Sequence, residues 1–220
     1  MNLSYYDTKR GLILPKDYNP KLAEFLGILT GDGYINIYKK YNNIIEIAGH
    51  SESDYEYLSV YVTNLIKNLF NITPKIIIKK GQNSMYLRIM SKGLVNYLIN
   101  IGFKKGRKNQ IGIPKWILKN DENFCSFVKG LADTDFSLVL LNRNQKNFKY
   151  YPRISLRSKS KILVKLVNQW LISKNFNTYT QFDYIQKDKR GYNDSILHTL
   201  HITLPTSLFL HLILRFAYLL

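Results

Sequence analysis

The sequence predicts an α+β fold built from two fused copies of one αββαββα unit. Helical and strand-like patterns follow one another in the same order twice along the 220 residues. An apolar stretch that contains glycine and ends near an aspartate also occurs twice, as FLGILTGDG at 25–33 and VKGLADTDF at 128–136. A basic segment rich in Gly and Asn, 104–123, separates the two copies. A period near 100 residues is too long for a solenoid, so it indicates two fused repeats.

The composition favours a globular protein with a polyanionic partner. Hydrophobic residues make up 45% of the chain, which excludes a disordered protein, and the formal net charge is +17. Such an excess opposes compaction and adds nothing to folding stability. It can reflect solubility or a codon bias toward Lys, Asn, Ile and Tyr. Together with 14% aromatic residues, it favours a nucleic-acid partner.

The cysteine content and the apolar segments indicate where in the cell the protein is located. Cys125 is the only cysteine, so neither an intrachain disulfide nor a cysteine-based zinc site can form. We expect an intracellular protein, in the cytoplasm or nucleoid, or in an organelle if the source is eukaryotic. The first residues lack the apolar core of a signal peptide. The apolar run at 208–220 is interrupted by His211 and Arg215 and is too short to span a bilayer, so we expect a buried helix and no membrane partner.

The first copy is expected at 20–103, after an N-terminal extension at 1–19. Asn19 and Pro20 predict a helix start, because Asn caps a helix and Pro suits its first turn. Asp32 and Gly33 are expected to end this helix, with Gly33 supplying the backbone freedom of the exit. A turn is predicted at Asn42–Asn43. The elements after the first helix are strands at 34–41 and 43–49, a helix at 53–70, strands at 74–80 and 84–90, and a helix at 91–102.

The second copy is expected at 124–220, after the linker 104–123, and repeats this order. Its elements are a helix at 124–134, strands at 137–143 and 149–157, a helix at 160–176, strands at 178–186 and 195–204, and a last helix from Pro205.

Small residues form a matching stripe on the first helix of each copy. An offset of 103 positions links Ala23, Gly27 and Gly31 to Ser126, Gly130 and Thr134. The spacing i, i+4, i+8 places each set on one narrow face of a helix. Glycine inside a helix costs about 1 kcal/mol relative to alanine, so these positions need a reason. Small side chains let two backbones approach closely. We therefore expect these two helices to pack on each other, which would bring Asp32 and Asp135 close together.

Two carboxylates at helix C-termini favour a divalent cation. Neighbouring carboxylates repel, and each would lie at the negative end of a helix dipole. A hard cation such as Mg²⁺ would offset both charges, with the backbone carbonyls of Gly31 and Thr134 as further ligands. At the centre of a basic surface, such an ion suits phosphodiester hydrolysis. The alternative is that each Asp caps its helix exit in solvent. Two acids at matched positions on glycine-striped helices favour the metal site.

At these residues the sequence resembles the LAGLIDADG homing endonucleases, single-chain two-motif type. FLGILTGDG matches the motif through Gly27, Gly31, Asp32 and Gly33, and VKGLADTDF matches it through Gly130, Asp133 and Asp135. The stretch IPKWI at 113–117 is similar to the inter-repeat region of archaeal intron-encoded members. The repeated element order extends the resemblance from about residue 20 to residue 220.

The resemblance implies a fold and an activity. Family members bind a long asymmetric DNA site with two antiparallel, saddle-shaped sheets and cut both strands across the minor groove. The motif helices pack at the interface of the repeats. Asp32 and Asp135 match the metal-binding acid of the motif, whereas Thr30 and Asp133 occupy a position off the metal. Phe136 departs from the final Gly of the motif, so we expect the backbone just past Asp135, and with it the second site, to differ from the first.

The resemblance also implies a basic or polar residue after the second strand of each copy. His50 matches this position in the first copy, where the alternative role is that of a histidine in a cap. Lys159 matches it in the second copy, with Arg157 as a weaker match. Each could orient water or stabilise charge on the phosphate. A simple phosphate contact is the alternative role of Lys159.

The candidate strands carry polar side chains that could contact double-stranded DNA. A β-ribbon fits the major groove, where side chains reach base edges, while Lys and Arg contact phosphates. For any one residue a solvated charge is an equal alternative. The predicted DNA-contacting residues are Asn36, Tyr38, Lys40, Lys75, Lys79, Lys80, Gln82 and Arg88 in the first copy, and Asn142, Arg143, Lys149, Arg153, Arg157, Gln181, Tyr184, Gln186 and Lys187 in the second.

The sequence therefore predicts a site-specific, metal-dependent DNA endonuclease that acts as a monomer. Mg²⁺ is the expected cofactor and Mn²⁺ a substitute, and Ca²⁺ is expected to bind without supporting cleavage. Two alternatives use the same scaffold: a maturase that assists splicing of an intron RNA, and a sequence-specific DNA-binding protein that does not cut. The paired acids favour cutting, because a pure binder gains nothing from carboxylates that face phosphates.

Overall fold

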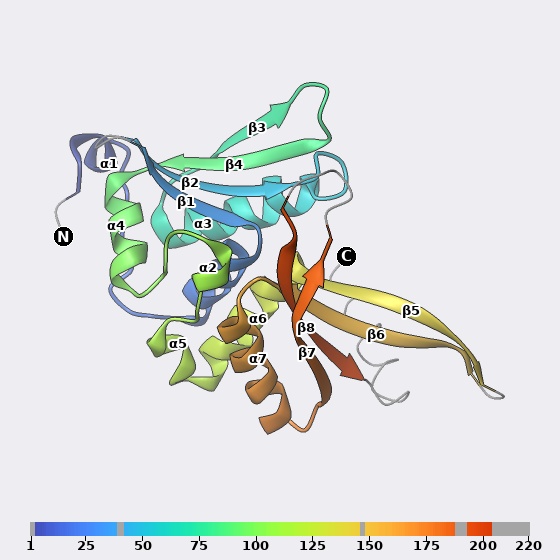
Figure 1. Ribbon diagram of the computed structural model, residues 1–220. Coiled ribbons are helices and arrows are strands. Elements are labelled where there is room, and N and C mark those ends of the chain that lie inside the picture. The colour runs from blue at the N-terminus through green and yellow to red at the C-terminus, as the bar shows by residue number, and fades with distance from the viewer. Residues whose placement is uncertain (1–2, 39–41, 146–147, 188–192, 204–220) are drawn as a thin grey trace. The chain divides into compact units, whose positions relative to one another are not determined.

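The computed structural model of the chain describes residues 3–38, 42–145, 148–187 and 193–203 (Figure 1). The chain forms two compact units, Met1–Thr134 and Asp135–Leu220. Each unit contains one four-stranded antiparallel sheet, so the predicted α+β fold with two repeats is confirmed.

The first unit contains a sheet of strand order β1-β2-β4-β3. Its sheet and main helices follow the predicted order, and three short helical segments, α1, η3 and α5, were not predicted. The elements are α1 (Tyr5–Lys9), α2 (Pro20–Gly31), β1 (Gly33–Tyr38), β2 (Asn42–Gly49), a π-helix η2 (Tyr57–Val62), α3 (Thr63–Phe70), β3 (Lys75–Lys79), β4 (Ser84–Met90), α4 (Lys92–Asn100), a short 3₁₀ turn η3 (Lys108–Gln110), α5 (Lys115–Leu118) and α6 (Asp121–Asp135).

The second unit repeats the sheet with strand order β5-β6-β8-β7 and one long helix packed on it (Figure 1). Leu156 and Leu200 on the sheet and Val164 and Val167 on the helix are buried, because alternate strand residues and one helix face meet in the same core. The elements are β5 (Phe136–Gln145), β6 (Phe148–Ser158), α7 (Lys161–Ser173), β7 (Asn177–Gln186) and β8 (Ser195–Thr203).

Helix α2 begins as the sequence predicts. Pro20 is its first residue, and the Asn19 side chain accepts a hydrogen bond of 2.9 Å from the Leu22 N–H. Every residue from Leu22 to Gly31 is buried. A helix buried on all sides has to be covered by protein along its whole length, which makes α2 the centre of the first unit.

Helices α2 and α6 meet backbone to backbone at two glycines. A Cβ added at Gly27 would lie 2.1 Å from the carbonyl oxygen of Phe127, and one added at Gly130 would lie 2.2 Å from that of Glu24. No side chain fits at either position, which confirms the close helix packing that the small-residue stripe predicts.

The helix α1 is held in place by the buried carboxylate of Asp7. This carboxylate accepts hydrogen bonds from the hydroxyl groups of Ser4 and Ser91, at 2.7 Å each, and from the Gly93 N–H at 2.9 Å. It also pairs with Arg10 at 2.5 Å. Burial alone would raise the pKa of Asp7, but these donors and the Arg10 charge outweigh it and lower the pKa.

Two local predictions are wrong and a third is confirmed only in part, each for a physical reason. Asn42 and Asn43 do not form a turn, because β2 already includes them. Gly33 does not have a left-handed backbone conformation. Glycine is needed at this position because a Cβ would lie 2.3 Å from the carbonyl oxygen of Leu29. The helix expected at 53–70 is interrupted by the π-helix Tyr57–Val62, a local geometry that hydrophobic periodicity does not register.

The last predicted helix, from Pro205, lies outside the described residues. Among the described helices, none has the length and apolarity that crossing a membrane requires.

We predict that Gly27→Ala destabilises the protein, although alanine is the better helix former by about 1 kcal/mol. The added methyl group has to displace the Phe127 backbone, so the free energy of unfolding should fall by about 2–3 kcal/mol in urea denaturation. Lys21→Ala, at an exposed position of the same helix, is the control and should change stability little. A Gly27→Ala protein as stable as the wild type would contradict the close packing.

We predict that Asp7→Asn lowers the free energy of unfolding by about 1–3 kcal/mol at pH 7, because it breaks the pair with Arg10 and unbalances the buried hydrogen bonds. The folded pKa of Asp7 lies below its ordinary value of 3.8, so the carboxylate stabilises the fold above that pH. The difference between wild type and variant should therefore shrink as the pH falls below 3.8. Asp17→Asn, at an exposed site, should show no such difference.

Candidate nucleic-acid interface

Asp32 lies where helix α2 ends and the first sheet begins. It is the C-cap residue of α2, and its N–H donates to the Ile28 carbonyl oxygen at 3.1 Å. Its own carbonyl oxygen accepts from the Ala48 N–H at 3.1 Å, which continues the pairing of β1 with β2. The predicted ligand Gly31 precedes it in the last turn of the helix, where carbonyl oxygens lack donors from the helix itself.

His50 follows strand β2 at the same end of the sheet as Asp32. Ile47 pairs with Gly33, and His50 comes three residues later. The Nδ1 atom of His50 accepts hydrogen bonds from the N–H groups of Glu52 and Ser53, at 3.3 Å each. The described contacts therefore give His50 a role in the turn after β2, which is the alternative role expected from the sequence. Its catalytic role stays a prediction.

The second unit repeats this arrangement with different residues. Phe136 pairs with Leu156 as Gly33 pairs with Ile47. Lys159 comes three residues after Leu156, so it occupies the position that His50 has in the first unit, and it is exposed. Asp135 immediately precedes Phe136, opposite the part of β6 that carries Arg157. The sheet pairing thus aligns His50 with Lys159, as expected, while their catalytic roles stay predictions.

The two motif ends differ in their local structure. Asp135 is the last residue of α6, whereas Asp32 lies just beyond the last residue of α2. Thr134, the predicted ligand before Asp135, uses its hydroxyl to donate to the carbonyl oxygen of Leu131 at 3.0 Å. Phe136 is the first residue of β5 and carries a large side chain. Gly33, the first residue of β1, has no room for a side chain. The departure of Phe136 from the motif therefore coincides with a different helix exit.

Four of the eight DNA-contacting residues predicted in the first unit share one face of the sheet. The strand pairings place Tyr34, Glu46 and Arg88 on one side, and Ile35, Ile47 and Leu87 on the buried side. By the same alternation, the exposed side carries the predicted Asn36, Lys75, Lys79 and Arg88. Lys80 and Gln82 lie in the turn between β3 and β4.

In the second unit a β-bulge keeps the predicted residues on one face. Gln181 pairs with Thr199 and Tyr184 with Leu197, so β7 has one extra residue at this point. The bulge lies next to Asp183, whose φ is 58° and whose N–H donates to the Nδ1 atom of His198 at 3.1 Å.

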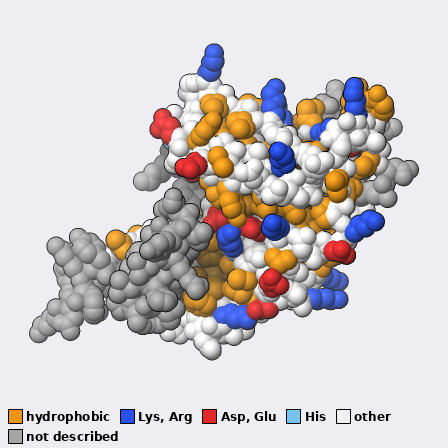
Figure 2. Space-filling view, turned by 180° about the vertical axis from the view of Figure 1, so that it is seen from behind, with side chains coloured by type: hydrophobic (Ala, Val, Ile, Leu, Met, Phe, Trp, Pro, Cys, Tyr) orange, Lys and Arg blue, Asp and Glu red, His pale blue; other side chains and the backbone are white. Residues whose placement is uncertain are grey.

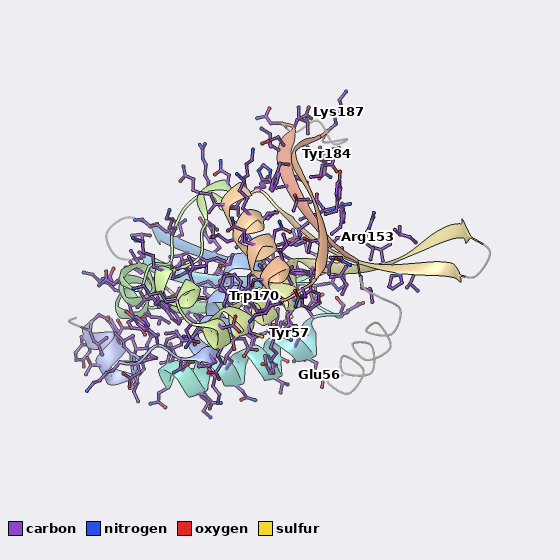
Figure 3. All side chains as sticks on the ribbon, turned by 90° about the horizontal axis from the view of Figure 1, so that it is seen from below. Glu56, Tyr57, Arg153, Trp170, Tyr184 and Lys187 are labelled. Carbon is purple, nitrogen blue, oxygen red and sulfur yellow. The ribbon has the colours of Figure 1, made fainter. Side chains whose placement is uncertain are left out.

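As a result of the bulge, five predicted residues share the exposed face of the second sheet. Without the extra residue, Gln181 and Tyr184 would lie on opposite faces, because strand side chains alternate. Arg153, Tyr184 and Lys187, which follows the end of β7, are labelled in Figure 3. The residues on this face are Arg153, Arg157, Gln181, Tyr184 and Gln186.

Five predicted residues are not tested by the described side chains. Lys40 lies outside the described residues, and for the other four only the strand backbone is described: Tyr38, Asn142, Arg143 and Lys149. The space-filling view shows Lys and Arg side chains interspersed with acidic and apolar ones (Figure 2). The polar faces of the two sheets are thus identified from the strand pairings, since that view shows no single large basic patch.

Comparison with known sequences gives a match to part of a much longer protein. No protein-family model matches the chain. Among curated proteins, 133 residues match an A-type ATP synthase subunit from Pyrococcus abyssi (strain GE5 / Orsay) at 32% identity. That match covers 59% of this chain but spans only 12% of the relative.

Several solved structures that resemble the chain are homing endonucleases. I-DmoI, in a study of its mesophilic variants, matches at 25% identity with a TM-score of 0.56, covering 84% of this chain and 89% of that chain. I-DmoI in complex with DNA and Ca matches equally well, covering 84% and 83%. The LAGLIDADG homing endonuclease I-LtrWI, bound to its target DNA, shares the fold at 10% identity, with a TM-score of 0.51 and coverage of 84% and 80%.

The chain has the fold of the two-motif LAGLIDADG homing endonucleases.

The structure adds a lysine near the first LAGLIDADG motif that sequence reasoning missed. The Nζ atom of Lys108 donates to the carbonyl oxygen of Thr30 at 3.3 Å. Its positive charge offsets the negative end of the α2 dipole two residues before Asp32. Local sequence offered no signal for this, because Lys108 belongs to the segment that reads as a basic linker.

A second missed group links the two LAGLIDADG helices through their side chains. Buried Glu24 on α2 accepts from the hydroxyl group of Tyr61 and pairs with Lys129 on α6 at 2.9 Å. Lys129 also donates to the Tyr61 hydroxyl oxygen at 2.8 Å. Burial alone would lower the pKa of Lys129, but its bonds to Tyr61 and Glu24 raise it, so the ammonium group stays charged.

Asp133 extends this group toward the end of α6. Its carboxylate accepts a hydrogen bond of 3.2 Å from the hydroxyl group of Tyr57, whose position on the π-helix is labelled in Figure 3. The residue is exposed, yet protein atoms packed around its carboxyl group raise its pKa, and the charge of Glu24 adds to this effect. The described contact gives Asp133 a structural role.

We predict that Glu24 and Lys129 stabilise the protein as a pair. Lys129→Met leaves a buried carboxylate without its cation, and Glu24→Gln removes the charge that Lys129 meets. In a double-mutant cycle measured by urea denaturation, the double variant should lose less stability than the sum of the single variants, with a coupling of about 1–2 kcal/mol. Lys119→Met, at an exposed position, is the control. Strictly additive losses would show that the pair contributes nothing.

Proposed function

We propose that the protein is a site-specific endonuclease that hydrolyses both strands of a long asymmetric DNA target with a divalent metal ion. The backbone-to-backbone packing of two glycine-striped helices, each of which leads through an aspartate into a polar sheet face, is the observation that supports this function best. The similarity to I-DmoI, which has been solved in complex with DNA and Ca, supports it further.

The residues at the motif ends fit a hard cation. Asp32 and Asp135 would supply carboxylate oxygens, and Gly31 and Thr134 would supply carbonyl oxygens, the ligand types that Mg²⁺ and Mn²⁺ prefer. Within the described part of the chain, no three His, Cys, Asp or Glu side chains gather into a metal-binding cluster. The proposed ion would therefore need DNA oxygens or water as additional ligands. When bound, it supplies Lewis-acid chemistry for phosphodiester hydrolysis.

The other residues of the chain would bind and orient the DNA. The exposed faces of the two sheets present Lys, Arg, Asn, Gln and Tyr, which can contact phosphates and base edges. Lys159 would stabilise charge on the phosphate from the second repeat, and His50 would orient water from the first. Because the two faces carry different side chains within one chain, a monomer would recognise an asymmetric site.

We predict that the protein cuts both strands of a duplex that joins the sequences on either side of its own coding gene, and that EDTA abolishes cleavage. Asp32→Asn and Asp135→Asn should each reduce cleavage by at least about 100-fold, because each removes a carboxylate from the reacting centre. The measurement is the rate of strand cleavage in Mg²⁺ with either strand labelled.

Asp133→Asn is the matched control for these variants. It changes an aspartate two residues from Asp135, yet an amide oxygen can still accept the bond from Tyr57, so cleavage should persist. Intact DNA in Mg²⁺ would contradict the proposed activity. DNA binding without cleavage would then identify a DNA-binding protein, and tight binding of the host intron RNA with faster splicing would identify a maturase. Normal cleavage by Asp32→Asn would contradict the metal assignment.

A further inference from the structure

One row of residues crosses the exposed face of the first sheet close to the end of the sheet where Asp32 lies. The pairings Tyr34 with Glu46, Glu46 with Arg88, and Arg88 with Lys75 place four side chains in line across β1, β2, β4 and β3. Asp32 pairs with β2 two residues further along that strand. The row therefore lies about 7 Å from the level of Asp32 along the strand.

Glu46 is unexpected in this row. Among the described strand side chains on this face, it is the one acid, and a carboxylate on a surface that meets phosphates weakens the attraction. Its Oε1 atom accepts the Nε–H of Arg88 at 2.6 Å and lies 2.5 Å from the Nη2 atom of Arg88. The Arg88 side chain is 40% exposed and that of Glu46 20% exposed, so the guanidinium group lies above its partner.

This contact leaves Arg88 arranged for reading a base. Glu46 contacts the edge of the guanidinium group formed by Nε and Nη2, and the outer N–H groups of Nη1 and Nη2 remain on the adjacent edge. Two coplanar N–H groups are what arginine uses to bind O6 and N7 of guanine in the major groove. A carboxylate that fixes the guanidinium plane before DNA arrives reduces the entropy that the contact would otherwise lose.

The second sheet has an oriented side chain at the equivalent position. Ser155 on β6 pairs with His201 on β8, as Glu46 on β2 pairs with Arg88 on β4. Each pair lies one residue along the strand from the pair that follows the aspartate, which is Phe136–Leu156 in the second sheet and Gly33–Ile47 in the first. The Ser155 Oγ atom lies 2.8 Å from the Nδ1 atom of His201, and the ring of Tyr179 stacks on the imidazole with 6.1 Å between ring centroids.

We infer that Glu46 and Ser155 are positioning residues that orient Arg88 and His201 to read bases at equivalent steps of the two half-sites. This inference rests on the proposed DNA recognition and adds the residues that set its specificity. Arg88 offers two outer donors and selects guanine, whereas His201 offers one ring nitrogen and does not select guanine in the same way. The two half-sites therefore differ at this step, although the two sheets have the same architecture.

The test is selection of bound sequences from a pool of randomised DNA duplexes, with the full-length protein in Ca²⁺. Arg88→Ala should lose about 10- to 100-fold discrimination at one base pair, the range of a good bidentate contact. Glu46→Ala should lose part of that discrimination at the same base pair, without weaker overall binding, because it removes a negative charge. Glu46→Gln retains an acceptor for the Nε–H and should restore the preference.

Ser155→Ala should act in the other half-site, at the base pair whose preference is lost in His201→Ala. Lys79→Ala, on the same face as Arg88 but in another row, is the control for phosphate contacts and should weaken binding to all sequences alike. Each variant is checked for folding by its thermal unfolding midpoint.

The outcomes separate this inference from the proposed function. If the wild type selects a sequence but Glu46→Ala and Arg88→Ala leave its base preferences unchanged, the inference fails alone. If Glu46→Ala changes a different base pair from Arg88→Ala, Glu46 reads a base itself and the positioning role is wrong. If the wild type selects no sequence, the inference fails together with the proposed function.

Discussion

The contact between the backbones of α2 and α6 is the constraint on which the rest of the structure depends. At Gly27 and Gly130 no atom beyond Cα fits between the helices, so their separation is set by the main chain and tolerates no larger residue. Each helix ends next to a strand that begins within one residue of its aspartate. The helix contact thereby fixes where the first sheet starts, and with it the row of residues that DNA bound to this sheet would meet.

The strand pairings then determine where each strand residue lies on the surface of its sheet. In the first unit, the Gly33–Ile47 pair sets which residues of β2 and β4 lie level with Asp32, and the Phe136–Leu156 pair does the same for Asp135 in the second. Side chains of the two units can therefore be compared row by row. This comparison aligns His50 with Lys159 and Arg88 with His201, although the sequences around these residues have little in common.

The two repeats share an architecture but differ in detail at several points. β5 and β6 are longer than β1 and β2, the bulge at Asp183 has no described counterpart in the first sheet, and α6 includes its aspartate while α2 does not. His198 and Lys161 hold the bulge, the former through the Asp183 N–H and the latter through its carboxylate at 2.5 Å. A single chain with two unequal halves can present two unequal surfaces, which a symmetric dimer cannot do.

The sequence by itself determined the repeat, the order of its elements, the glycine stripe and the polar character of the strands, because these follow from periodicity and from the size of side chains. Asn19 as a helix cap and Gly27 as a close contact were readable for this reason. Only the tertiary structure decided which distant residues meet. The pairs of Glu46 with Arg88, Ser155 with His201, and Glu24 with Lys129 join strands or helices that are separated in the sequence, so no local pattern contains them. The same holds for Lys108 beside the end of α2 and for the bulge that brings Gln181 and Tyr184 to one face, since both depend on how neighbouring segments pack.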